Sequence, residues 1–141
     1  MKADSATENQ VLTAVDGIMN AYADHDIHGL LSRFAADDDI VMYGTGRDER
    51  RVGPAEIREQ AERDWAQADS IAMRFDERNV WTAGDVAWVA LDGAFELAAG
   101  GQTMELPARV SLVFEKRDGD WLAVHGHFST PAAGQEVGQS F

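Results

Sequence analysis

Cysteine is absent from this 141-residue chain, and proline occurs only three times. Without cysteine the chain can have no disulfide, no thiol nucleophile and no cysteine-ligated metal. That usage is typical of a reducing compartment, so we expect a cytoplasmic protein. Apolar runs of the roughly 20 residues that span a bilayer are also missing. Asp4, Glu8 and Asp16 interrupt the N-terminal stretch, where a signal peptide would be apolar. We therefore expect no membrane partner.

Positive charge is scarce, with 12 basic against 25 acidic side chains and a formal net charge of −13. A field of that sign repels phosphate backbones and anionic lipids, which disfavours nucleic acid as a partner. The same charge also has a simpler role in keeping a protein soluble. Apolar residues make up 45% of the chain, as in ordinary globular proteins. The length suits one domain, which we place at residues 1–131, followed by a flexible tail at 132–141.

Helical periodicity predicts three helices in the first half of the chain. The first begins at Ser5, which has capping-box spacing to an acidic residue, and ends near His25. Asp26 can cap a short second helix. The third begins at Gly53-Pro54, because proline is well placed in a first helical turn. Each helix carries one apolar stripe that can pack on a sheet.

Period-two alternation then predicts a set of strands separated by glycine-rich turns, at residues 40–43, 69–81, 86–97, 104–115 and 121–129. We expect Arg47 to Val52 to be a charged connection without a strand, and Gly93 to mark a bulge or bend. This order of elements predicts an α+β fold: a cone-shaped, strongly bent antiparallel sheet with three helices packed on one face. Such a cone usually leaves a cavity between sheet and helices.

Two motifs near the C-terminus carry a family resemblance: Phe-Glu-Lys-Arg-Asp-Gly-Asp-Trp at 114–121 and Val-His-Gly-His-Phe-Ser at 124–129. Together with the element order, they resemble the nuclear transport factor 2-like superfamily and its SnoaL-like members, over about Glu8 to Pro131. The closest match in motif is the association-domain group of calmodulin-dependent kinase II. The resemblance implies a cystatin-like fold, a dimer and a pocket, but no single reaction.

The chain departs from two patterns within that superfamily. Ketosteroid isomerases carry a base aspartate on the first strand, and here Tyr43 stands at that place. The kinase association domain carries a cavity-facing arginine at the position that Ala90 occupies. Trp65 on the third helix, by contrast, resembles a tryptophan found near the cavity in that group. The first departure argues against isomerase chemistry of the ketosteroid type.

The residues that we expect to line the cavity are mostly aromatic: Tyr43, Trp65, Trp88, Asp92, Leu112 and Phe128. Asp92 stands out because a carboxylate in the middle of a strand is costly to bury unless it is paired or protonated. Asp92 is therefore a candidate catalytic acid or base, with Tyr43 as its hydrogen-bond partner. The alternative is that Asp92 lies in water at the cavity mouth.

A second group shares the opposite phase of the last two strands: Arg109, Ser111, His125, His127 and Ser129. The spacing of His125 and His127 could hold a zinc ion, but the sequence offers no third ligand. A role in acid–base chemistry and an anion-binding role for Arg109 stay open. If Leu122, Val124 and Phe128 face the helices, the histidines face away. We then expect a polar network at a dimer face, and we expect neither a metal nor a cofactor.

These observations leave three functional hypotheses. The first is a SnoaL-like homodimer that binds a small molecule in an internal cavity. The second is an enzyme of isomerase, cyclase or dehydratase type that uses Asp92, Tyr43 or a histidine to transfer a proton on a carbonyl-containing substrate. The third is an oligomerising scaffold like the kinase association domain. The sequence identifies neither the ligand nor the reaction.

Overall fold

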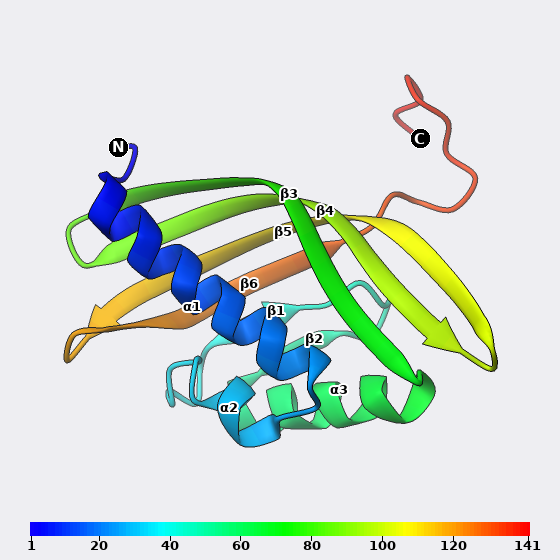
Figure 1. The fold of residues 1–141 in the computed structure, drawn as a ribbon, viewed down its shortest axis with the longest axis horizontal. Helices are drawn as coiled ribbons and strands as arrows, with labels where there is room; N and C mark the ends of the chain where they lie inside the picture. The colour runs from blue at the N-terminus through cyan, green and yellow to red at the C-terminus, as the bar shows by residue number, and fades with distance from the viewer.

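The computed structural model describes residues 1–141 and has an α+β architecture, as the sequence predicts. Its elements in chain order are α1 (Ser5–Ala23), α2 (Ile27–Leu31), β1 (Val41–Tyr43), β2 (Arg50–Val52), α3 (Gly53–Gln67), β3 (Ser70–Ala83), β4 (Val86–Ala99), β5 (Gln102–Arg117) and β6 (Asp120–Ser129). Helix α1 crosses one face of a long, bent sheet, while α2 and α3 gather at one end of it (Figure 1).

Local capping explains where the first two helices begin. Asp4, one residue before the expected start, is extended and its carboxylate accepts a hydrogen bond from the Thr7 amide at 2.8 Å. Asp26 caps α2 in the same way, by accepting from the Gly29 amide at 2.9 Å. Side chains of this kind satisfy amides that have no partner inside the helix. Helix α1 therefore begins at Ser5 as expected, but the residue that caps it is Asp4 and not Ser5.

The sheet has the strand order β2-β1-β6-β5-β4-β3. Its pairs are antiparallel except β1 with β6, which is parallel. Strand β2 corrects the expectation of a connection without a strand, since Arg50 pairs with Tyr43 and Val52 with Val41. A three-residue strand with two arginines shows no alternation, so only its pairing with β1 identifies it.

Two irregularities bend the sheet. Gly93 on β4 lies so close to β3 that a Cβ atom there would be 1.8 Å from the Arg74 carbonyl oxygen, and the β3–β4 register shifts beside it, between Phe75 and Glu77. On β6 the register shifts again, because Val113 pairs with His125 while Phe114 pairs with Ala123. Bulges of this kind bend a strand and increase its twist.

The β6 bulge also decides which of its side chains enter the core. Ala123 and Gly126 are buried on either side of the bulge, whereas Leu122 and Val124 are only half-buried. The expectation that Leu122 and Val124 share the helix-facing phase with Phe128 is corrected accordingly, because one extra residue reverses the alternation.

One hydrophobic core lies between α1 and the sheet. Val11 and Val15 on α1 pack in the same cluster as Leu112 and Phe114 on β5, and all four are fully buried. No helix covers the opposite face of the sheet (Figure 1). None of the three helices combines the length and hydropathy needed to cross a bilayer.

Candidate functional site

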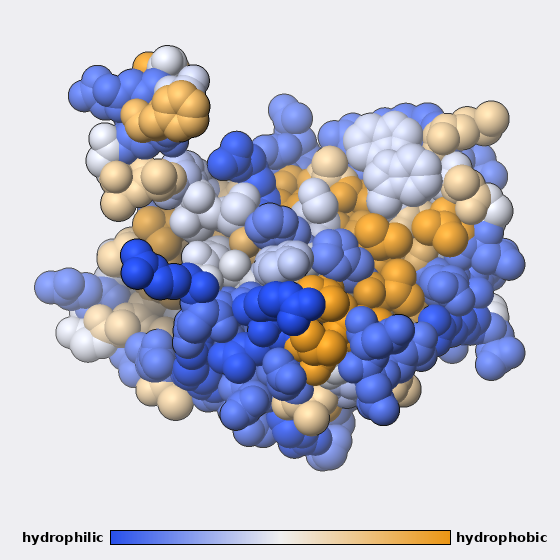
Figure 2. All heavy atoms as spheres, turned by 180° about the vertical axis from the view of Figure 1, so that it is seen from behind, coloured by the Kyte–Doolittle hydropathy of each residue, from blue (hydrophilic) through white to orange (hydrophobic).

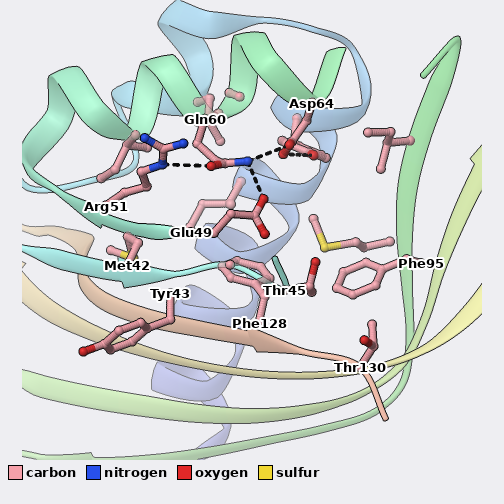
Figure 3. A pocket seen from close by; sticks show the side chains of 18 of the residues that line it. Met42, Tyr43, Thr45, Glu49, Arg51, Gln60, Asp64, Phe95, Phe128 and Thr130 are labelled. Atoms are coloured by element: carbon pink, nitrogen blue, oxygen red, sulfur yellow. Dashed lines mark hydrogen bonds between the residues drawn. The ribbon is translucent and has the colours of Figure 1, made fainter. Parts of the chain in front are cut away.

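A pocket of about 290 Å³ opens between the helices and the concave face of the sheet (Figure 3). Most of its wall is apolar. The sheet contributes Met42, Ile71, Met73, Phe95, Leu97, Leu106 and Phe128, and the helices and their connections contribute Ile18, Leu30, Phe34, Ile57 and Ala61. Apart from Thr45 and Thr130, which lie near Phe95 and Phe128, the polar side chains gather on one side (Figure 3).

That polar wall comes from α1, α3 and the β1–β2 hairpin. The Tyr22 hydroxyl donates to Asp64 Oδ2 at 2.6 Å, and Gln60 Nε2 donates to Asp64 Oδ1 at 2.7 Å and also to Glu49 Oε1. Gln60 Oε1 in turn accepts from Arg51 Nε at 2.8 Å. The five side chains form one continuous network (Figure 3).

Helical spacing explains how α3 supplies its part of the pocket. Gln60 and Asp64 are four residues apart, and Ile57 and Ala61 lie one helical turn apart beside them, so all four fall on one side of the helix. Sequence reasoning missed Gln60 and Asp64 because polar positions on an amphipathic helix usually face water. A partial signal existed: both occur in the same turn of the helix as the buried Ala61.

Glu49 joins the network from the loop between β1 and β2. Its Oε2 accepts from the Gly46 amide, and Arg63 Nη2 lies 3.4 Å from its Oε1. Arg63 also holds the neighbouring Asp48 at 2.8 Å. The carboxylate of Glu49 is thereby tied to both its own loop and α3.

Among the residues that line the pocket, Tyr22 has the most strongly shifted pKa. Burial, together with the hydrogen bond to Asp64, raises the pKa of the Tyr22 phenol well above its ordinary value. Both effects oppose a second negative charge beside a carboxylate. The Tyr22 hydroxyl therefore stays protonated and keeps donating to Asp64.

Of the residues expected at the cavity, Phe128 and Tyr43 line the pocket. Phe128 does so from the concave face of β6. Tyr43 lies at the rim with its hydroxyl directed away from the polar wall, and its ring packs against His127 with 5.2 Å between centroids (Figure 3). Tyr43 is no hydrogen-bond partner of Asp92.

Trp65 and Leu112 do not line the pocket, although they lie near it. Trp65 Nε1 donates to the Tyr22 carbonyl oxygen at 2.9 Å, and its indole stacks on His25 with 4.9 Å between centroids. Trp65 thus supports the end of α1 that carries Tyr22. Leu112 is fully buried in the core under α1.

Trp88 and Asp92 lie on the opposite face of the sheet from the pocket, which corrects their expected position. Val89 and Leu91, their neighbours on β4, are buried against the helices, so strand alternation directs Trp88 and Asp92 outward. Trp88 stacks on Trp81 with 6.5 Å between centroids, and Asp92 is exposed opposite Arg109. An exposed carboxylate is not the buried group that the catalytic assignment assumed.

The structure brings the second predicted group together on that outer face. In the β5–β6 ladder Arg109 pairs with Ser129 and Ser111 with His127, while His125 pairs with Val113. Side chains of directly paired residues lie on one face. His125 Nδ1 is 2.6 Å from the Val41 carbonyl oxygen, which ties the ring to β1. No three histidine, aspartate or glutamate side chains converge on a common point.

Comparison with known proteins places the chain in a family. A family model described as a SnoaL-like domain matches residues 11–133, which is most of the chain. No curated protein matches. Among solved structures, a nuclear transport factor 2-like superfamily protein from Salmonella enterica is 20% identical, with a TM-score of 0.83, over 99% of this chain and 100% of that one.

Two further structures carry provisional functional names. One from Xanthomonas campestris, named as a calcium/calmodulin-dependent protein kinase II association domain, is 26% identical over 94% of this chain and 95% of its own, with a TM-score of 0.78. One from Streptomyces avermitilis, named as a dehydratase of the NTF2-like family, is 18% identical over 89% and 97%, with a TM-score of 0.81. Other similar structures are described as having a cystatin-like fold. By its family match, the chain belongs to the SnoaL-like domain family, and it shares its fold with structures of the nuclear transport factor 2-like superfamily.

Proposed function

We propose that this protein binds a small, largely apolar molecule in the pocket between α1, α3 and the sheet. The observation that carries the proposal is the division of the pocket into an apolar wall and a single polar wall. Burying apolar surface supplies most of the binding free energy, and a few fixed polar groups orient a ligand. Phe95, Phe128 and Met73 supply the apolar surface, while Tyr22, Gln60 and Asp64 form the polar side.

An environment-sensitive naphthylamine dye tests this proposal. The dye should bind with increased fluorescence, and Met73→Trp should lower its affinity tenfold or more, because the larger side chain fills the pocket. Asn79→Trp is the matched control, since Asn79 lies on the same strand outside the pocket. Equal loss in both variants, or dye binding unaffected by Met73→Trp, would show that the dye binds elsewhere and would contradict the proposal.

We also propose that two copies associate through the uncovered face of the sheet, and that this homodimer functions in the cytoplasm. Tyr43, Val86 and Trp88 are each 37% exposed, which is high for large apolar side chains. Pale and orange atoms extend across much of this face in Figure 2. Exposed apolar surface of this kind marks association sites. The group Arg109, Ser111, His125, His127 and Ser129 would then supply hydrogen bonds at the interface.

Light scattering at micromolar concentration tests the homodimer. The wild type should have twice the mass of one chain, and Trp88→Glu should shift it to a monomer because a charge would be buried at the interface. Asn9→Glu, which adds the same charge on the exposed side of α1, should stay dimeric. A monomeric wild type would refute the dimer. A larger, closed oligomer would favour the scaffold suggested by the Xanthomonas structure's name.

A second candidate function is proton transfer on a carbonyl-containing substrate, as in a dehydratase. It is favoured by the two carboxylates, Glu49 and Asp64, that line a largely apolar pocket. On this hypothesis the base is Asp64 and not the exposed Asp92. A β-hydroxy ketone that fits the pocket would lose water, and Asp64→Asn should lower kcat by at least a hundredfold while Asp92→Asn leaves it unchanged. Absence of turnover with a ligand that demonstrably binds would leave binding as the function.

A further inference from the structure

On the polar wall, the donors of Tyr22 and Gln60 already have acceptors. The Tyr22 hydroxyl donates to Asp64, and the two N–H groups of Gln60 are shared between Asp64 and Glu49. The orientation of the Gln60 amide is set by Arg51, because its Nε can only donate, to Gln60 Oε1. Around Tyr22, Gln60 and Asp64, what the wall still offers a ligand is oxygen lone pairs, on the carboxylates and on the Tyr22 phenol.

The charge of the pocket also favours a ligand with hydrogen-bond donors over an anion. Two carboxylates, Glu49 and Asp64, and one guanidinium, Arg51, are among its lining residues, so its formal charge is negative. Arg51 is also committed, since its Nε binds Gln60 and its Nη1 lies 3.9 Å from Glu59 outside the pocket. Arg63 pairs with Asp48 and Glu49 from outside the lining, so these three carboxylates and two guanidiniums together keep a net negative charge. The rest of the chain adds to this negative potential.

We infer that the pocket selects an amphiphile whose polar end is a hydrogen-bond donor, a hydroxyl or an ammonium group, and rejects the carboxylate of the same carbon skeleton. This inference rests on the proposed small-molecule binding. A hydroxyl or ammonium donates to Asp64 or to the Tyr22 oxygen while the apolar body lies against Met73 and Phe95. A carboxylate would lose its water and meet two like charges, and the Tyr22 and Gln60 donors of this wall are already occupied.

Three ligands with one skeleton test the selection: 4-phenylbutan-1-ol, 4-phenylbutan-1-amine and 4-phenylbutanoate, titrated calorimetrically at neutral pH. The alcohol and the amine should bind, and the acid should bind at least tenfold more weakly than the alcohol. A smaller difference overturns the inference while leaving the pocket as a binding site. If no member of the series binds, and the naphthylamine dye does not bind either, the proposed function itself fails and the inference fails with it.

Variants show whether the polar wall causes the discrimination. The ratio of acid to alcohol dissociation constants should fall at least threefold in Asp64→Asn and in Glu49→Gln, because each removes one negative charge at nearly constant size. Glu62→Gln removes a carboxylate from the exposed side of α3 and should leave the ratio unchanged. Since both ligands are measured on the same variant, a general loosening of the pocket cancels. Glu49→Gln keeps the test available if Asp64→Asn does not fold.

Arg51 provides the outcome that would reverse the inference. If its guanidinium turned toward a bound anion, the acid would bind as tightly as the alcohol in the wild type, and Arg51→Gln would weaken the acid selectively. We expect instead that Arg51→Gln leaves the acid the weakest ligand of the series. Selective loss of acid binding in that variant would identify the pocket as an anion site.

Discussion

The two faces of the sheet differ in which elements supply their polar side chains. On the concave face the long strands β3 to β6 contribute apolar side chains to the pocket, and the charged groups arrive from α3 and the β1–β2 hairpin, as Glu49, Arg51 and Asp64 do. On the outer face the strands themselves carry the polar and aromatic residues, including His127 and Trp88. Both faces come from the same alternating strands.

The contrast shows why residue type alone does not locate a site on a sheet. Histidines and a mid-strand aspartate attract attention in a sequence, yet Asp92 and His127 lie where no helix encloses them. Enclosure away from water is what shifts the pKa of a titratable group most strongly. Tyr22 illustrates this effect, because its burial beside Asp64 raises the pKa of its phenol.

The largest difference between the faces should appear in stability. Leu112 is fully buried on the helix side of β5, and its neighbour Ser111 is exposed on the outer side. Leu112→Ala should lower the free energy of unfolding by ~2–5 kcal/mol, because it leaves a cavity in the core. Ser111→Ala should change it by less than about 0.5 kcal/mol. Urea denaturation of the two variants measures both, and similar losses would contradict the assignment of the two faces.

A second difference concerns added volume on β6. A Cβ atom at Gly126 would lie 2.7 Å from Leu112 Cδ2 and 2.9 Å from Met42 Sδ, so Gly126→Ala overpacks the concave side. We expect a loss of about 1–3 kcal/mol in the free energy of unfolding. His127→Ala removes atoms from the exposed neighbouring position and serves as the control. Denaturant midpoints that do not move in Gly126→Ala would show that β6 tolerates a side chain there.

The two tyrosines allow a pH test of the same contrast. The pKa of the Tyr22 phenol is raised from its ordinary value of 10.0 in the folded protein, so above that pH the unfolded chain loses a proton that the folded chain retains. The stabilisation is complete below the unfolded pKa and is lost as pH rises further. Denaturation between about pH 9 and pH 11 should show a shallower decline in Tyr22→Phe than in the wild type.

At neutral pH, Tyr22→Phe should cost about 1 kcal/mol, because it removes the hydrogen bond to Asp64. Tyr43→Phe is the control, since this ring lies at the pocket rim beside His127. The opposite result would be a loss of stability at alkaline pH that disappears in Tyr43→Phe but persists in Tyr22→Phe. It would assign the alkaline sensitivity to the outer face.

The smallest effect is expected at Asp92. This carboxylate is exposed opposite Arg109, so Asp92→Asn should change the free energy of unfolding by less than about 0.5 kcal/mol. It should also leave dye affinity in the pocket unchanged, as measured by fluorescence titration. A tenfold loss of dye affinity would show that the outer face communicates with the pocket and would return Asp92 to consideration as a functional residue.

Much of the fold can be predicted from local chemistry. The Asp26 cap, the proline in the first turn of α3 and the glycine-containing turns between the long strands each act within a few residues, so sequence spacing indicates them well. Strand β2 was not predicted, because it is defined by its pairing with β1 and not by alternation in its own sequence. The bulge on β6 was not predicted for the same reason, since it is defined by the pairing with β5.

By itself, the sequence determined the α+β class, the family and the presence of one apolar and one polar phase along each long strand. Only the tertiary structure decided which phase the helices cover, and that the polar wall consists of Tyr22, Glu49, Arg51, Gln60 and Asp64. The physical reason is that periodicity acts within one element, whereas a pocket forms between elements. Glu49 and Asp64 meet at the Gln60 amide only after the β1–β2 hairpin packs on α3.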